Sequence, residues 1–383
     1  PSALSGLFSQ ADIPEPESDF ETSVTKHSEP QKYADGKEIL SRFGRDLTAE
    51  AAQGQLDTLV GRRDELLRLA QVLSQKRKGN AILVGEAGVG KTCIVEGFAR
   101  KIVSPECQPA FYNKRIVELS ISALVGGTRY RGDLEKRLES IIREAEADPN
   151  LILFIDEFHT VMEKEGEGSG VINIFIPALA RGKVRLIAAT TTHEYERGLA
   201  RNESVARRFQ VVWVEEPSRA EALEIIDGVK TSLERHHAVK ISKQATDAAV
   251  DLSIRYLPHL RLPDKALDLL DQACAKLRLE SLTIKADVAE TTLLTMNTQA
   301  VTVGRADIAR VLSQFVRVPF ELIAASDQER MSVLEAYLTR WIIGQEQAMR
   351  TVAESLRAAY QGLKDPRRPI ASFLLAGPTG VGK

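Results

Sequence analysis

Five short, continuously apolar segments recur along the chain, and helix-like stretches separate them. They are residues 81–84, 116–119, 151–155, 184–189 and 211–214. Continuous apolar character, rather than strict alternation, is typical of strands buried on both faces of a parallel sheet. The clearest helical stretch runs from Asp133 to about Ala147, with apolar residues recurring on one face. Strands that alternate with helices predict an α/β sandwich built on a parallel sheet.

The pattern changes after Glu216. Ser218 and Glu221 have the spacing of a capping box, which marks the start of a helix. From there to about residue 318 the periods are helical, and no strand core is evident. Pro263 is well placed to open a further helix, whose inward positions are Leu267, Leu270, Cys274 and Leu277. We therefore expect a small all-helical domain after the α/β domain.

Changes in composition set the remaining boundaries. Residues 1–38 are rich in Pro, Ser, Asp and Glu and have little apolar periodicity, which predicts a linker or tail. The α/β domain is then expected to cover 39–215 and the helical domain 216–318, and a further segment covers 319–383. The first residue is not Met, so we expect the chain to be a piece of a longer protein.

The bulk composition narrows the class of protein. The chain has 383 residues, of which 43% are hydrophobic and 27% charged, and its net charge is -2. No apolar run approaches the roughly 18 residues that a membrane helix needs, and no signal-peptide pattern opens the chain. Three scattered cysteines and six scattered histidines suggest neither a disulfide framework nor a metal site. These features favour a cytoplasmic protein with no bulk electrostatic preference for nucleic acid.

A glycine-rich loop joins the first apolar segment to a helical stretch. It matches the pattern G-x-x-x-x-G-K-[ST] and consists of Gly85, Glu86, Ala87, Gly88, Val89, Gly90, Lys91 and Thr92. Such glycines let successive N–H groups point at phosphate oxygens, and the following helix adds its positive N-terminal end. Lys91 is expected to reach the β- and γ-phosphates, and the Thr92 hydroxyl to bind Mg²⁺. A chance glycine-rich turn is disfavoured by the strand before the loop and the helix after it.

Cys93 follows this loop at the start of the helix. Its position makes it part of the nucleotide-binding segment, and a thiol at a helix N-terminus can be reactive. A small, buried packing residue is the favoured interpretation of Cys93.

Two carboxylates follow the third apolar segment. Asp156 and Glu157 come directly after residues 151–155, and the carboxyl ends of parallel strands are where α/β sheets bind ligands. We expect Asp156 to hold Mg²⁺ through water, and Glu157 to orient the water that attacks the γ-phosphate. Acidic residues also end strands for solubility, but the phosphate loop favours the catalytic role. Threonines 190–192 end the next apolar segment and suit either a γ-phosphate sensor or an ordinary strand end.

Further motifs occur in a fixed order from about Phe43 to the end of the chain. They are Phe43-Gly44-Arg45-Asp46-Leu47-Thr48, Val60-Gly61-Arg62, Ile152-Leu153-Phe154-Ile155-Asp156-Glu157, Ala206-Arg207-Arg208-Phe209 and Leu262-Pro263-Asp264-Lys265-Ala266. Together with the phosphate loop they resemble the Clp family of AAA+ unfoldases, in particular the first ATPase module of ClpA- and ClpB-like proteins. The resemblance implies a P-loop AAA+ parallel-sheet sandwich followed by an all-helical lid. It also implies ATP or ADP with Mg²⁺ as cofactors, and ATP hydrolysis coupled to protein unfolding.

The resemblance assigns roles to individual residues. Thr191 aligns with the first sensor, while Arg207 and Arg208 align with arginine fingers that enter the neighbouring subunit's site. Fingers that act in trans imply a ring, which in this family is usually a homo-hexamer. Leu59 and Val60 would cover the adenine, and the helical domain would close that pocket with Ile225, Ile226 and Pro263.

The segment Gly127-Thr128-Arg129-Tyr130-Arg131-Gly132 aligns with the family's loop that faces the central pore. An aromatic ring between flexible glycines can press on any polypeptide without reading its sequence, so Tyr130 is expected to contact protein substrate. A buried core tyrosine is the alternative, which the neighbouring Gly and Arg residues disfavour. Residues 163–173 are more hydrophobic than the family's usual Asp-Ala-Ala-Asn pattern, which leaves a second pore-facing loop undecided.

Two departures from the family pattern refine these expectations. Only residues 282–302 stand where disaggregating members carry a long coiled-coil insertion, which favours a ClpA-like arrangement. The chain ends in a second phosphate-loop sequence, Gly377-Pro378-Thr379-Gly380-Val381-Gly382-Lys383, cut before its Ser/Thr. We therefore expect 319–383 to be the truncated start of a second AAA+ module. An adaptor-binding domain is expected before Pro1, and adaptor or peptidase partners would use regions outside this chain.

Two other classes of function remain alternatives. Basic pore loops would favour a nucleic-acid-remodelling AAA+ ATPase. This chain instead has Tyr130 in the aligned loop and a net charge of -2. A nucleotide-dependent scaffold with little turnover would be favoured by loss of Glu157 or Arg207, and both are present. The sequence therefore predicts a ring-forming unfoldase that acts on unfolded or tagged proteins, without nucleic-acid or membrane partners.

Overall fold

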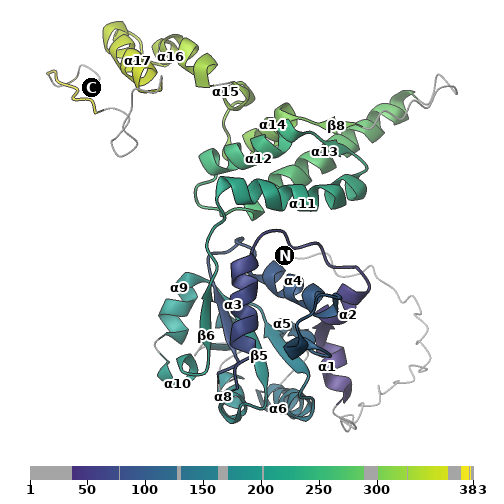
Figure 1. Cartoon of the computed structure of the whole chain (residues 1–383). Coiled ribbons are helices and arrows are strands. Elements are labelled where there is room, and N and C mark those ends of the chain that lie inside the picture. Colours follow the sequence, from purple (N-terminus) through teal and green to yellow (C-terminus); the bar gives the residue numbers. More distant parts are fainter. Residues whose placement is uncertain are drawn as a thin grey trace, which may run out of the picture. The chain divides into compact units, whose positions relative to one another are not determined.

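A six-stranded sheet organises the first part of the chain (Figure 1). The protein is described by a computed structural model that covers residues 37–76, 78–126, 131–162, 171–200, 202–288, 301–325, 327–360, 372–378 and 380. The strand order is β1-β3-β4-β5-β2-β6, in which β1 is antiparallel to β3 and the other pairs are parallel. The strands are β1 (Gly44–Asp46), β2 (Ala81–Val84), β3 (Arg115–Leu119), β4 (Leu151–Ile155), β5 (Arg185–Thr190) and β6 (Gln210–Trp213).

The parallel sheet is confirmed, and each of the five apolar segments forms one of its strands. The strand β1 was not predicted. Its residues Gly44, Arg45 and Asp46 include no large apolar side chain, so no hydrophobic pattern marks them. It is a strand because its backbone pairs with β3, with Gly44 opposite Leu119.

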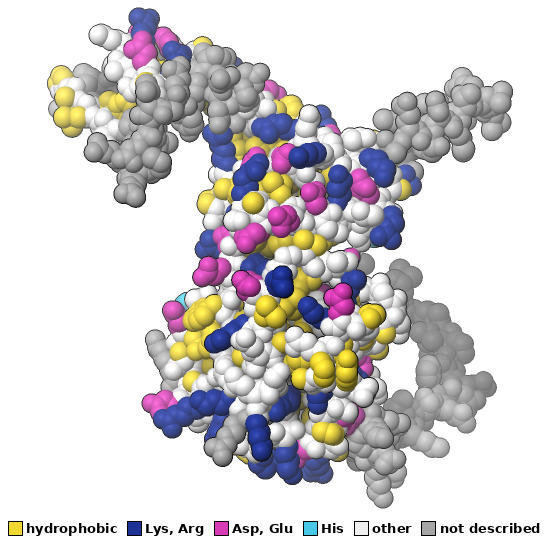
Figure 2. All heavy atoms as spheres, in the orientation of Figure 1, with side chains coloured by type: hydrophobic (Ala, Val, Ile, Leu, Met, Phe, Trp, Pro, Cys, Tyr) yellow, Lys and Arg dark blue, Asp and Glu magenta, His cyan; other side chains and the backbone are white. Residues whose placement is uncertain are grey.

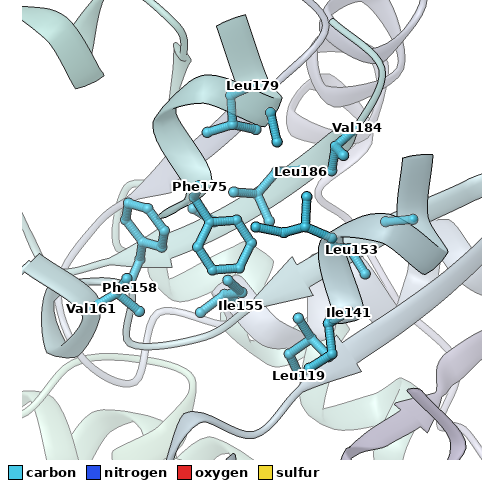
Figure 3. Packing of buried hydrophobic residues seen from close by; sticks show 14 of the residues in the cluster. Leu119, Ile141, Leu153, Ile155, Phe158, Val161, Phe175, Leu179, Val184 and Leu186 are labelled. Atoms are coloured by element: carbon cyan, nitrogen blue, oxygen red, sulfur yellow. The ribbon is translucent and has the colours of Figure 1, made fainter. Parts of the chain in front are cut away.

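Helices cover both faces of this sheet (Figure 1). Successive side chains of β4 point to opposite faces, so Leu151, Leu153 and Ile155 enter one apolar core and Ile152 and Phe154 the other. Figure 3 shows the first core, where Phe175 points toward β4 residues Leu153 and Ile155. The helices of this part are α1 (Lys37–Phe43), α2 (Leu47–Ala52), α3 (Arg63–Leu73), α4 (Lys91–Val103), η1 (Pro109–Phe111), α5 (Ile121–Val125), α6 (Arg131–Ala147), α7 (His159–Met162), α8 (Val171–Arg181), α9 (Thr192–Glu194), η2 (Tyr195–Leu199) and α10 (Glu203–Ala206).

A helical part with its own apolar core follows β6. Its helices are α11 (Arg219–His237), α12 (Lys243–Tyr256), α13 (Asp264–Val288), α14 (Arg305–Val316) and α15 (Phe320–Ala324). The expectation of an all-helical domain needs one correction, because β7 (Lys240–Ile241) and β8 (Thr302–Val303) pair in parallel. These strands are two residues long, too short to leave a periodic pattern in the sequence.

The predicted helix starts in this part are confirmed. The Ser218 side chain accepts a hydrogen bond from the Glu221 amide at 3.4 Å, and the Glu221 carboxylate accepts one from the Ser218 amide at 2.8 Å. This reciprocal capping box opens α11. Helix α13 begins directly after Pro263, with Leu270 and Cys274 fully buried and Leu267 and Leu277 partly buried.

Two further helices, α16 (Asp327–Trp341) and α17 (Glu346–Tyr360), follow the helical core. Among the described residues, no helix has the length and apolar character needed to cross a membrane. Figure 2 shows basic and acidic side chains interspersed over the helical part on the face in view. The predicted tail up to residue 36, the Tyr130 loop, the 163–170 loop, and Thr379 with residues 381–383 of the second phosphate loop lie outside the described residues.

Candidate nucleotide-binding site

The phosphate loop lies between β2 and α4, at the carboxyl end of its strand. Gly88 and Gly90 have φ angles of 80° and 96°, a left-handed conformation that side chains disfavour. Gly88 is also crowded, because an added Cβ would lie 2.8 Å from the Cβ of Asp264. Helix α4 begins at Lys91, so its free N–H groups point into the loop. The local geometry is therefore that of an anion cradle.

Lys91 folds back over this loop. Its ammonium donates hydrogen bonds to the carbonyl oxygens of Gly85 at 2.9 Å and Glu86 at 2.8 Å. Burial lowers the pKa of Lys91, and the carboxylates of Asp156, Glu86 and Glu157 oppose that effect. A phosphate group in the cradle would add further negative charge beside this cation.

The Thr92 hydroxyl meets the first carboxylate of the acidic pair. Thr92 Oγ1 donates to Asp156 Oδ2 at 2.5 Å, although the two residues are 64 positions apart in the chain. One comes from the first turn of α4 and the other from the end of β4, with β5 between β2 and β4 in the sheet. The other carboxylate oxygen, Asp156 Oδ1, accepts the Glu157 amide at 2.8 Å. Two residues predicted to bind metal thus lie side by side.

Glu157 is held in an unusual backbone conformation. Its φ angle is 46° and its side chain is exposed. The next residue, Phe158, is fully buried, donates its amide to the Ala189 carbonyl at 2.8 Å and packs against the ring of Phe209. Backbone strain of this kind persists where the surroundings enforce it, and it is concentrated at functional sites. The buried Phe158 is what presents the Glu157 carboxylate at the sheet edge.

Thr190 ends β5 and Thr191 follows it, and both line the same recess as the acidic pair. Thr191, the residue aligned with the sensor, caps α9 by accepting the Glu194 amide at 3.3 Å. Thr190 is buried, and its hydroxyl oxygen has no hydrogen-bond partner within the described part of the chain. Sequence reasoning singled out Thr191, while the structure brings both hydroxyl-bearing residues to the same place.

These groups line one recess of about 340 Å³. From the α/β part it is lined by Ala87, Gly88, Gly90, Lys91, Thr92, Cys93, Asp156, Glu157, His159, Thr190 and Thr191. From the helical part it is lined by Pro263, Asp264 and Leu267. The structure therefore brings together most of the predicted phosphate-loop residues, the acidic pair, the predicted sensor Thr191 and the predicted adenine contact Pro263.

The favoured interpretation of Cys93 as a buried packing residue is wrong. Its side chain is exposed and lines the recess, whereas Cys107 and Cys274 are buried. Cys93 lies on the first turn of α4, on the side that faces the recess rather than the core. Surrounding protein nevertheless desolvates the thiol and raises its pKa, with Glu96 and Asp57 contributing in the same direction.

Four of the five predicted adenine contacts lie outside the recess. Leu59 lies against Gly97 of α4, and Val60 lies so close to Gly228 of α11 that an added Cβ there would be 2.2 Å from Val60 Cγ2. Ile226 is fully buried in the helical core, and Ile225 is half-buried. None of these four residues lines the recess, so the adenine pocket stays a prediction.

The arginine pair lies outside the recess. Arg207 and Arg208 directly follow α10 and are exposed, and Arg207 forms an ion pair with Glu203. Exposure and distance from the local recess are what residues that act on a neighbouring subunit require, and they also suit ordinary surface charge.

Arg62 and Asp264 contribute to the site without having been predicted as site residues. Arg62 donates to the Val89 carbonyl and to the Glu65 carboxylate, both at 2.8 Å, and thereby braces the phosphate loop. The Asp264 amide approaches the Gly88 carbonyl at 3.4 Å. Both residues belong to motifs that the sequence revealed, but their contacts join segments far apart in the chain.

Comparison with known proteins identifies two matching families along the chain. Residues 81–212 match the ATPase family associated with various cellular activities (AAA), and residues 218–307 match the AAA lid domain. The ATP-dependent Clp protease ATP-binding subunit ClpC of Staphylococcus aureus is 38% identical over 90% of this chain and 48% of its own length. The chaperone protein ClpB of Oceanobacillus iheyensis is 36% identical with the same coverage. The chain thus spans about half the length of these relatives.

Solved structures of Hsp104 have the same fold. Hsp104 in a closed state with ATPγS and FITC casein matches with a TM-score of 0.71 and 32% identity, over 86% of this chain and 54% of that one. The extended Saccharomyces cerevisiae Hsp104:casein complex matches with a TM-score of 0.68 and 34% identity, with the same coverage.

Proposed function

The chain belongs to the Clp/Hsp100 family of AAA+ proteins, and from this premise we propose that it is an ATP-hydrolysing part of a protein unfoldase. In this proposal residues 39–215 form the large nucleotide-binding domain and 216–318 the lid. Residues 319–383 are the start of a second module. The contact between Thr92 and Asp156 carries the proposal, because it joins the phosphate loop to the acidic pair at one recess.

The donor set at this contact suits Mg²⁺. Mg²⁺ in phosphate-transfer sites is held by one or two protein oxygens, with water and substrate phosphates completing its shell. Thr92 and Asp156 provide one hydroxyl and one carboxylate. No cluster of three or more His, Cys, Asp or Glu residues suited to a metal ion occurs in the described ranges. When bound, Mg²⁺ would neutralise charge on the phosphates.

The remaining residues divide the work of hydrolysis. Lys91 and the loop amides bind the β- and γ-phosphates, and Glu157 orients and polarises the attacking water. Thr191 senses the γ-phosphate, and Thr190 offers a second, buried hydroxyl beside it. Leu59, Val60, Ile225, Ile226 and Pro263 are proposed to enclose the adenine of ATP or ADP.

Replacing Glu157 tests the hydrolytic role. Glu157→Gln keeps the size of the side chain but removes the basic carboxylate, so ATP turnover should fall by about 10²-fold or more while ATP binding persists. Phosphate release and equilibrium ATP binding are measured together, with the exposed α11 substitution Glu224→Gln as control. Unchanged turnover in Glu157→Gln would remove Glu157 from the mechanism. A wild-type chain that does not bind ATP would overturn the whole proposal.

The proposed work of the whole protein is to thread polypeptide through a homo-hexameric ring in the cytoplasm. The Hsp104 relatives were solved with casein, which supports unfolded or tagged protein as the substrate class. Tyr130 is proposed to grip that substrate, and Arg207 and Arg208 to complete a neighbour's site. An adaptor or a separate peptidase would contact regions outside this chain. No observation favours the nucleic-acid-remodelling or scaffold alternatives.

A further inference from the structure

Glu216 lies in the short connection between β6 and α11 and contacts a distant loop of the helical part. Its Oε1 accepts the Leu262 amide at 2.9 Å, and its Oε2 accepts a guanidinium N–H of Arg261 at 3.1 Å. The Lys265 ammonium lies 3.5 Å from Oε1. One carboxylate thus receives a backbone amide and two cations from a five-residue stretch, 261–265.

The buried ammonium of Lys265 makes loss of the Glu216 carboxylate energetically unfavourable. Its side chain is only 4% exposed, and it donates to the carbonyls of Leu260 at 2.9 Å and Leu257 at 3.4 Å. A buried ammonium needs a compensating charge, and Glu216 is the carboxylate paired with it. Partial burial acts to raise the Glu216 pKa, but the bonds from Leu262 and Arg261 and the charge of Lys265 outweigh it, so the pKa is lowered.

The loop that Glu216 holds is also the loop that reaches the recess. Pro263 and Asp264 of this loop line the recess, and so does Leu267 on the first turn of α13. The Asp264 amide approaches the Gly88 carbonyl of the phosphate loop at 3.4 Å. Ion pairs therefore link Glu216 to the loop that contacts the phosphate loop, although Glu216 and Arg261 are 45 positions apart in the chain.

We propose that Glu216 is a positioning residue for nucleotide binding, which fixes loop 261–265 so that Pro263 and Leu267 stay at the recess and Asp264 stays against Gly88 of the phosphate loop. This inference rests on the proposed function of the recess. Glu216 lies in the connection between β6 and α11, so its bonds hold this loop of the helical part against that connection.

The test compares three substitutions by equilibrium ADP binding, ATP turnover and thermal unfolding without nucleotide. Glu216→Gln keeps an acceptor for the Leu262 amide but loses the charge that faces Arg261 and Lys265. Glu216→Asp keeps the charge on a side chain one methylene shorter. Glu215→Gln makes the same charge change at the exposed neighbouring position. We expect ADP binding to weaken about tenfold in Glu216→Gln, to be partly restored in Glu216→Asp and to stay at the wild-type value in Glu215→Gln.

Two outcomes would overturn the inference while leaving the proposed function intact. One is wild-type ADP affinity in Glu216→Gln. The other is loss of ADP binding together with loss of cooperative unfolding, because Glu216 would then serve folding rather than positioning. Failure of the wild-type chain itself to bind ADP or ATP would instead overturn the proposed function.

Discussion

Cys93 is exposed at the recess and is therefore accessible to thiol reagents. Cys93 is the one exposed cysteine of the chain's three, and it shares the recess with Lys91 and Thr92. Its pKa is raised by desolvation and by nearby carboxylates. Because the thiolate is the reactive form, Cys93 should be less reactive near neutral pH than an unperturbed cysteine. If the recess holds nucleotide as proposed, the reactivity of this thiol should report its occupancy.

Alkylation of Cys93 by iodoacetamide should therefore be slower than that of free cysteine at pH 8, should accelerate as pH rises, and should be suppressed by ATP or ADP. Mass spectrometry of the Cys93 peptide measures the rate. Cys93→Ser should abolish rapid labelling, because Cys107 and Cys274 are buried and their pKa values are also raised, that of Cys274 to about 12. Labelling at the rate of free cysteine, or labelling indifferent to nucleotide, would contradict the placement of Cys93 in the recess.

At the scale of single elements, helix α11 depends on its first turn. Ser218 and Glu221 satisfy each other's backbone amides there, and such caps contribute about 1 kcal/mol. Helix α11 also contributes the buried residues Ala222 and Ile226 to the helical core. Loss of the cap should therefore weaken the whole helical part rather than fray one end.

Ser218→Ala should lower the free energy of unfolding of the helical part by about 1 kcal/mol. Urea denaturation followed by circular dichroism measures the change. Ser140→Ala is the matched control: Ser140 is half-buried in the middle of α6, where its hydroxyl bonds to the Lys136 carbonyl and alanine favours the helix. Equal stability of Ser218→Ala and the wild-type chain would show that the capping box contributes nothing here.

The elements differ in how far sequence could predict them. Strands β2 and β4 are buried on both faces, so their apolar runs are unmistakable, and the phosphate loop is fixed by a local backbone requirement for glycine. Strand β1 exists only through its pairing with β3, and β7 and β8 are two residues long. The contacts of Arg62 with Val89 and of Glu216 with loop 261–265 depend on segments brought together by the fold. No periodicity or local motif carries that information.

At the scale of the whole molecule, the proposed ring would give a function to two arginines that do not line the recess of their own chain. Arg207 and Arg208 are exposed after α10, and neither lines the recess of its own chain. If they complete a neighbour's site, hydrolysis requires association of chains. Arginine fingers elsewhere accelerate phosphoryl transfer by about 10³- to 10⁵-fold.

ATP turnover per chain should therefore rise with protein concentration, and Arg207→Ala should remove most of that rise while leaving ATP binding intact. Steady-state phosphate release over a wide concentration range measures the effect, and sedimentation velocity reports association. The exposed Arg143, paired with Glu139 on α6, supplies the control Arg143→Ala. A turnover that does not depend on concentration, with Arg207→Ala harmless, would mean that the chain hydrolyses ATP alone.

The edge strand β1 has a consequence for a protein proposed to handle extended polypeptides. It is three residues long, and its central Arg45 is engaged by the carboxylates of Glu50, Glu96 and Glu118. An open sheet edge is a template on which foreign strands add and aggregates grow, and short, charged edge strands discourage such addition. Without β1, the longer apolar strand β3 would form that edge. By ending the sheet at this edge in three residues around a fixed charge, the fold disfavours the addition of a foreign strand there, as a protein proposed to handle extended polypeptides requires.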